Sequence, residues 1–172
     1  MSDRLARAVT RFAEIEADLN ALDAATGDGD HGATMLKGLR AAAEAKEAPE
    51  KAFRKAAGGA SGALFAQLIA ALLKIDGGAP VGAALKDAAE RIALLGQAKA
   101  GDKTMLDALL SAAEADTLAE AARAADAGRA ATAELDAKRG RARYVEGLGR
   151  GHVDAGATSV AELLAIWAEG TE

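Results

Sequence analysis

An acidic, glycine-bent stretch near the start of the chain carries the residues best suited to chemistry. The sequence LDAATGDGDHGATM sets three carboxylates, Asp23, Asp28 and Asp30, around two flexible glycines. Carboxylate oxygens are the ligands that hard cations such as Mg²⁺ prefer, and these ions commonly bind together with substrate phosphates. The stretch therefore predicts a site for a divalent cation and a phosphate group.

Two other interpretations apply to the same acidic stretch. The first is a solvated turn in which Asp30 caps the helix that follows. The second is an EF-hand, because Asp28 and Asp30 occupy loop positions one and three. An EF-hand requires a glycine at position six and a glutamate at position twelve, where this chain has Ala33 and Leu39. The EF-hand is excluded, whereas the simple turn and the metal site both stay open.

Two glycine-containing segments further along the chain have the composition of phosphate-binding loops. The run GGASG, residues 58–62, is either a packing break between helices or a phosphate site. In the second case Ser61 and free N–H groups would lie at the positive end of the next helix. The segment GQAKAGDKT, residues 96–104, has the glycines and lysine of a P-loop. Asp102 interrupts that pattern and no strand precedes it, so the P-loop is excluded.

The remaining polar candidates are weak when each is taken alone. His31 and His152 are the two histidines, and both lie in glycine-flanked polar segments, which argues against core packing for either. Asp154 precedes a helical pattern and is best interpreted as its N-cap. A short basic segment reads as a solvated face by itself: Lys138, Arg141 and Arg143.

Length and composition limit the class of protein. A chain of 172 residues is expected to form a single domain over residues 1–172. Hydrophobic residues make up 51% but aromatic residues only 3%, which indicates closely packed helices with small side chains between them. A net charge of −5 argues against nucleic acid and anionic membranes as partners. Without cysteine, a signal peptide or a run long enough to span a bilayer, the expected location is cytoplasmic.

Apolar periodicity predicts helices over almost the whole chain. Glycine clusters at 58–62 and 140–156 interrupt the pattern, and Gly128 kinks or divides the seventh helix. Strands are not expected, because no segment alternates with period two and valine and isoleucine are scarce. The fold class is therefore all-α, with antiparallel neighbours joined by short loops. The predicted helices span 3–20, 32–46, 49–57, 63–75, 81–95, 104–115, 117–137 and 158–168.

Five motifs, in a fixed order, resemble the nucleotide-binding L subunit or domain of the dihydroxyacetone kinase family. They are LDxxxGDGDHG, GGASG, GDKTM, GRARY and GHVDAGATS, and they extend from Leu22 to Ser159. The resemblance implies an antiparallel barrel of eight α-helices with Mg-nucleotide bound at one end, where the interhelical loops converge. The predicted helices are compatible with an all-α barrel or bundle of about eight helices.

The resemblance also implies which residues form the site. Asp23, Asp28 and Asp30 would hold two Mg²⁺ ions that bridge the phosphates of ADP or ATP, and no catalytic side chain is implied on this chain. The implied nucleotide contacts come from three groups of residues. Phosphate contacts come from His31, Gly32, Ala33, Thr34, Ala60 and Ser61, the nucleobase pocket from Gly96 and Met105, and closure over the nucleotide from Arg141, Asp154, Ala155 and Gly156.

Two features depart from the family pattern. Ala155 replaces the proline usual in the DPGA motif, which implies a looser loop over the nucleotide. The helical spacers between motifs are shorter than in the family, which is compatible with a barrel shortened at the end away from the site.

The resemblance implies two chemistries that share this kind of domain. In one, ATP phosphorylates a short-chain ketose; in the other, ADP stays bound and is rephosphorylated by a phosphotransferase-system subunit. In both, a separate K subunit or domain holds the sugar. The chain begins with methionine and carries only the nucleotide half, so we expect a stand-alone ADP-binding L subunit with these two partners. ATP-dependent transfer, a non-catalytic protein that binds a transcription regulator, and an all-helical scaffold remain as alternatives.

Overall fold

The computed structural model describes residues 3–170 and confirms the all-α class. Within that range the chain forms nine α-helices and three short 3₁₀ turns, with no strand. The helices are α1 Asp3–Glu14, α2 Glu16–Ala24, α3 His31–Glu44, α4 Pro49–Ala57, α5 Gly59–Asp76, α6 Val81–Gly96, α7 Met105–Ala112, α8 Leu118–Ala131 and α9 Ala155–Ala168. The 3₁₀ turns are η1 Thr132–Glu134, η2 Arg141–Tyr144 and η3 Glu146–Gly149.

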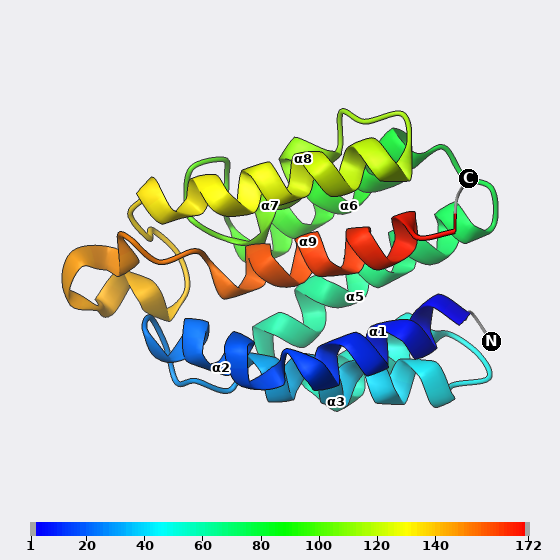
Figure 1. The fold of residues 1–172 in the computed structure, drawn as a ribbon, viewed down its shortest axis with the longest axis horizontal. Helices are drawn as coiled ribbons and strands as arrows, with labels where there is room; N and C mark the ends of the chain where they lie inside the picture. Colours follow the sequence, from blue (N-terminus) through cyan, green and yellow to red (C-terminus); the bar gives the residue numbers. More distant parts are fainter. Residues whose placement is uncertain (1–2, 171–172) are drawn as a thin grey trace.

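Helices that follow each other in the chain pack side by side and close into a ring. From α3 to α9, each helix contacts the next one, and α9 returns to contact α1 and α2, which both lie against α3. Short loops make most neighbours antiparallel, so the loops gather at the two ends of the assembly (Figure 1). The loop between α2 and α3 and the long segment between α8 and α9 share one end, opposite the two chain termini.

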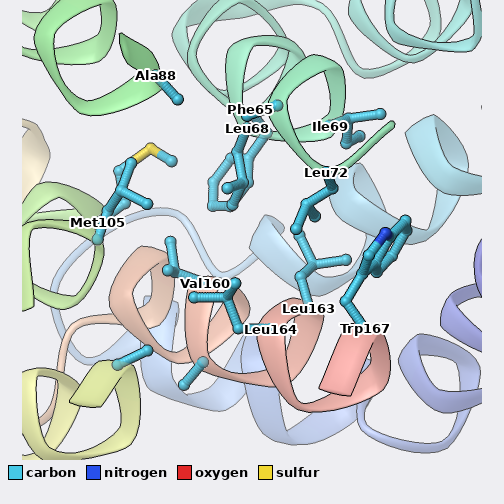
Figure 2. Packing of buried hydrophobic residues seen from close by; sticks show 14 of the residues in the cluster. Phe65, Leu68, Ile69, Leu72, Ala88, Met105, Val160, Leu163, Leu164 and Trp167 are labelled. Carbon is cyan, nitrogen blue, oxygen red and sulfur yellow. The ribbon is translucent and has the colours of Figure 1, made fainter. Parts of the chain in front are cut away.

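The core lies between the faces of α5 and α9 (Figure 2). Phe65 of α5 lies over Val160 of α9, and Leu72 lies over Leu163 and Trp167. All five side chains are at most 2% exposed. Burying each such side chain contributes about 1.5–3 kcal/mol. Elsewhere the interior mixes many alanines with larger apolar side chains, and the alanines allow the helix backbones to approach closely, as the composition predicted.

Several helix boundaries differ from the predicted ones; α7, for example, ends at Ala112 rather than at residue 115. The predicted helix over 3–20 is two helices, because the backbone leaves helical geometry at Ile15 (φ −101°, ψ 8°). Ile15 is itself buried, so the apolar stripe continues across the break and hides it. α5 begins at Gly59 rather than at residue 63, so only Gly58 of the GGASG run lies outside a helix. α9 begins at Ala155, three residues earlier than predicted.

The segment after residue 117 also ends differently from the prediction. α8 stops at Ala131 and passes into the η1 turn, whereas the predicted helix ran on to residue 137. Gly128 neither kinks nor divides α8. A Cβ atom at Gly128 would come within 2.6 Å of Ser111 Oγ and 2.9 Å of the Asp107 carbonyl oxygen. The glycine is therefore needed for the close approach of α8 to α7.

α5 is long and apolar enough, by length and composition, to cross a membrane. The expectation that no run has this length is therefore wrong, because the helix extends back to Gly59 and reaches 18 residues. Its buried residues belong to the core shown in Figure 2, and a core helix passes the same test.

Candidate functional site

A cavity of about 470 Å³ opens at the end of the barrel where the α2–α3 loop and the α8–α9 segment meet. Its walls come from six parts of the chain. These are the acidic loop with the start of α3, the first turn of α5, the end of α6, the start of α7, residues 139–142 and the start of α9. Loops far apart in the sequence thus converge on one concave surface, as a small-molecule site requires.

The three loop carboxylates form a cluster at one edge of this cavity. One carboxylate oxygen from each of Asp23, Asp28 and Asp30 lies within 4.8 Å of the others. Asp28 and Asp30 are exposed, while Asp23 is half-buried at the end of α2. Three carboxylates at this spacing repel one another unless a cation lies between them, and their oxygens form the donor set of a hard divalent ion. The residues present therefore fit a magnesium site.

The hydrogen bonds around the aspartate cluster differ from those expected if Asp30 capped α3. Asp30 occupies the N-cap position of α3, but its side chain makes no capping hydrogen bond. Instead, Asp23 Oδ2 accepts the backbone N–H groups of Asp30 at 3.0 Å and His31 at 3.2 Å. Asp28 forms an ion pair with Arg141 from across the cavity. The prediction that the Asp30 side chain caps α3 is therefore wrong, and its carboxylate is left for other ligands.

His31 lies in the interior, contrary to the expectation from its glycine-rich surroundings. The residue is 8% exposed, its Nε2 lies 2.8 Å from Ser159 Oγ of α9, and its ring centroid lies 5.8 Å from that of Phe65. Burial lowers the pKa of His31, and the nearby Asp23 carboxylate opposes this shift. Local sequence failed here because the surrounding groups come from α5 and α9. His152 is exposed, as expected.

The first turn of α5 borders the cavity through Ala60 and Ser61. At the start of a helix the backbone N–H groups lack intrahelical partners and the helix dipole is positive, so this end favours an anion. Ser61 is half-buried and Ala60 is exposed. The run does contain a break between helices, but the break is confined to Gly58, because residues 59–62 are helical.

Most of the other sequence-predicted nucleotide contacts also line the cavity. Gly32 is buried and Ala33 donates its N–H to Asn20 Oδ1 at 3.2 Å, and neither residue lines the cavity. Their part in phosphate binding stays a prediction. The predicted residues that do line it, beyond those already described, are Thr34, Gly96, Met105, Arg141, Asp154, Ala155 and Gly156.

Asp154 is the N-cap of α9, as the sequence indicated. Its Oδ2 accepts the N–H of Ala157 at 2.7 Å, and its own N–H donates to Thr132 Oγ1 at 2.9 Å. Burial raises the pKa of Asp154 to about 6, even though the Ala157 hydrogen bond and the charge of Lys103 lower it. The carboxyl group therefore changes its charge just below neutral pH while it borders the cavity.

Sequence reasoning missed a buried charged group beside the site. Lys103 is 2% exposed and donates from Nζ to the carbonyl oxygens of Thr132 and, at 2.6 Å, His152. Asp102 is 2% exposed, accepts the N–H of Lys99 at 3.0 Å and lies 3.6 Å from Arg139 Nε. Only the GDKTM motif marked these residues, and nothing in that polar loop predicted their burial.

Comparison with protein families shows which family this chain belongs to. The DAK2 domain model matches residues 25–169, which include all five motifs except the first residues of the acidic one. The chain belongs to the DAK2 domain family. This assignment confirms the resemblance to the L subunit of dihydroxyacetone kinases and agrees with the all-helical fold.

Relatives of this DAK2 domain fall into two length classes. A D-erythrulose kinase of Mycolicibacterium smegmatis is 39% identical, but the match covers 87% of this chain and only 31% of that enzyme. The ADP-binding subunit DhaL of a PTS-dependent dihydroxyacetone kinase from Lactococcus lactis is 33% identical over 89% of this chain and 87% of that subunit. The DAK2 domain thus spans about a third of the erythrulose kinase and most of the separate subunit.

A solved structure has the same fold as this DAK2 domain. The crystal structure of the dihydroxyacetone kinase from C. freundii in complex with AMP-PNP and Mg²⁺ superimposes with a TM-score of 0.72 at 27% identity. The superposition covers 96% of this chain and 33% of that chain.

Proposed function

We propose that this DAK2 domain is the ADP-binding L subunit of a phosphoenolpyruvate-phosphotransferase-dependent dihydroxyacetone kinase. The observation that carries the proposal is the cluster of three aspartates on a cavity that is also lined by the first turn of α5. A cation-binding edge and an anion-binding helix end on one cavity suit a magnesium-bound polyphosphate. The match over most of a separate DhaL subunit favours the two-subunit form.

In this proposal each part of the cavity has one task. Asp23, Asp28 and Asp30 hold two Mg²⁺ ions, which when bound neutralise phosphate charge during in-line phosphoryl transfer. Ser61 and the first N–H groups of α5 bind phosphate oxygens, and Gly96 with Met105 lines the base pocket. Arg141 exchanges its partner Asp28 for the nucleotide. The ketose acceptor sits on a separate K subunit, so no nucleophile is needed on this chain, which spans residues 1–172 as one domain.

Partners and location follow from the same proposal. The K subunit would meet the open end of the cavity, and a phosphotransferase-system subunit would rephosphorylate the bound ADP. A cytoplasmic protein without nucleic-acid or membrane partners fits the acidic net charge of −5. A transcription regulator is a further candidate partner, and if it were the only one the protein would be a nucleotide-binding regulator rather than an enzyme.

A second candidate function is the L domain of an ATP-dependent ketose kinase. The observation that favours it is the 39% identity to a D-erythrulose kinase, together with the fold match to a kinase solved with AMP-PNP and Mg²⁺. The two candidates differ in whether the nucleotide leaves after each turnover.

Mass spectrometry of the nucleotide released from the purified, denatured protein tests the proposal. Near-stoichiometric ADP supports the ADP-cofactor form, and ATP that exchanges freely supports the ATP-dependent form. A protein that neither retains ADP or ATP nor binds them in added Mg²⁺ would overturn both candidates. Phosphorylation of dihydroxyacetone should then require a K subunit, and sugar phosphorylation by this chain alone would contradict the two-subunit proposal.

A further inference from the structure

Lys103 is buried at a junction of three segments. It precedes α7, while its two acceptors lie in the turn after α8 and in the segment just before α9. Lys103 is 2% exposed, and burying an ammonium group costs free energy unless its N–H groups are hydrogen-bonded. The two carbonyl oxygens accept from two of the three N–H groups. Burial lowers the pKa of Lys103, and the charges of Asp154 and Asp136 oppose that shift.

Thr132 forms the second half of the same junction. Thr132 is fully buried. Its Oγ1 donates to the Arg129 carbonyl oxygen at 2.6 Å and accepts the N–H of Asp154 at 2.9 Å. Its carbonyl oxygen accepts from Lys103. Thr132 therefore joins the end of α8, the lysine and the first residue of the DAGA turn, residues 154–157.

The segment held by this junction has little packing of its own. Residues 145–153 contain three glycines; the η3 turn lies within them and the η2 turn just before them, and most of both turns is exposed. Gly149 has a φ of 73°, and a Cβ there would come within 2.8 Å of Thr26 Cγ2 and 3.2 Å of Lys103 Cε. The lysine stem and the acidic loop thus both contact the segment at Gly149. A segment of this composition needs such fixed contacts to hold one conformation.

We propose that Lys103 and Thr132 are positioning residues that hold the turn of residues 154–156 in place over the bound nucleotide. The inference rests on the proposed function, because it assigns a role in binding the nucleotide of that same cavity. Hydrogen bonds from these buried side chains fix the backbone at His152, two residues before the N-cap of α9, and at Asp154, the N-cap itself.

A direct phosphate contact by Lys103 is the competing role for this side chain. Lys103 does line the cavity, but two geometric facts oppose a direct contact: the residue is almost fully buried, and Nζ already donates to two backbone carbonyl groups. Thr132 does not line the cavity at all, so it cannot contact a ligand there. If removing the Thr132 hydroxyl lowers nucleotide affinity, the cause is therefore a change in the turn of residues 154–156 and not a lost contact with the nucleotide.

The test compares Lys103→Met, Thr132→Ala, Thr132→Ser and the double variant Lys103→Met/Thr132→Ala in the full chain. Thr132→Ala removes only the hydroxyl and keeps the proposal testable if Lys103→Met fails to fold, and Thr132→Ser restores the hydroxyl. Lys86→Met is the charge control, since Lys86 is exposed and lies ten residues before the end of α6, about 15 Å along the helix. Calorimetry measures the affinity for Mg-ADP and for Mg²⁺ alone.

We expect Lys103→Met and Thr132→Ala each to weaken Mg-ADP binding by about tenfold or more, as loss of a buried hydrogen bond does. Thr132→Ser and Lys86→Met should stay near the parent, and affinity for Mg²⁺ alone should not change. The double variant should lose less than the product of the two single losses, because both residues act through one turn. Hydrogen exchange of residues 149–154 should become faster in Lys103→Met and Thr132→Ala before nucleotide is added.

Three results would overturn the inference. The first is parental Mg-ADP affinity in both single variants, even with lowered melting temperatures, which would leave only a structural role. The second is independent losses that multiply in the double variant. The third is faster exchange across the whole chain rather than over residues 149–154. A parent protein that binds no Mg-ADP would instead show that the proposed function itself is wrong.

Discussion

Neutralising Asp154 should stabilise the folded protein at neutral pH. The pKa of Asp154 rises from its ordinary value of 3.8 to about 6, chiefly through burial. Each pKa unit corresponds to about 1.4 kcal/mol, so the charged carboxylate costs the folded state at most about 3 kcal/mol. The value is an upper limit because the carboxylate borders an open cavity. Asp154→Asn removes this cost and keeps an oxygen that can accept from the Ala157 N–H.

The sign of the pH dependence follows from the raised pKa. The unfolded chain loses the Asp154 proton near pH 4, while the folded chain keeps it to about pH 6. Between these values the folded state binds more protons, so the parent protein loses stability as pH rises. The stability of the Asp154→Asn variant lacks this pH-dependent contribution. Its stability advantage over the parent should be small at pH 4, grow through pH 6 and stay constant above it.

Urea denaturation at pH values between 4 and 8 measures this difference. Asp136→Asn is the control, because a hydrogen bond from Arg150 lowers the pKa of Asp136 and gives the opposite sign. That carboxylate stabilises the fold above pH 4 and loses its effect as the folded group becomes protonated in acid. An Asp154→Asn variant less stable than the parent at pH 7.5, or an advantage that does not vary with pH, would refute the reasoning.

Three further substitutions test separate parts of the structure. Arg141→Ala should tighten the binding of Mg²⁺ alone, since the ion no longer competes with Arg141 for Asp28, and should weaken the binding of Mg-ADP. Calorimetry that shows both affinities falling would contradict this. Trp167→Ala removes a fully buried side chain and should cost about 3–5 kcal/mol in urea denaturation, with Mg-ADP affinity retained in the protein that stays folded. Thr104→Ala breaks the capping box with Asp107 at the start of α7 and should cost about 1 kcal/mol; an unchanged midpoint would show that water replaces the cap.

The sequence predicted the fold class and most helices because apolar periodicity is a local signal. α4 begins and ends where predicted, at Pro49 and Ala57, since proline and glycine mark both ends. The break at Ile15 escaped prediction because the buried isoleucine continues the apolar stripe of both helices. Helix ends that proline or glycine marks could be predicted from the sequence. A bend that leaves the apolar stripe unbroken could not.

Prediction of the candidate site succeeded for residues that stand in motifs and failed for tertiary burial. The aspartate cluster could be predicted because three acids fall within eight residues, from the end of α2 to the start of α3. Burial of His31 depends on Phe65 and Ser159, which lie far along the chain, and no local pattern reports it. Lys103 failed for the same reason, since its carbonyl partners follow it by dozens of residues. Polar loops are usually solvated, and here two charged residues of such a loop are buried.

Titration of Mg-ADP into the Asp28→Asn variant tests whether the acidic loop holds the metal-bound nucleotide. The substitution removes one charge of the cluster with little change of shape, and Asp18→Asn, at an exposed position on α2, is the control. The fold should survive, since a loop aspartate outside the core costs no more than about 2 kcal/mol. We predict that Asp28→Asn loses Mg-ADP binding with its helical circular dichroism intact, while Asp18→Asn binds like the parent. Parental affinity in Asp28→Asn would show that the loop is only a turn and that the site assignment is wrong.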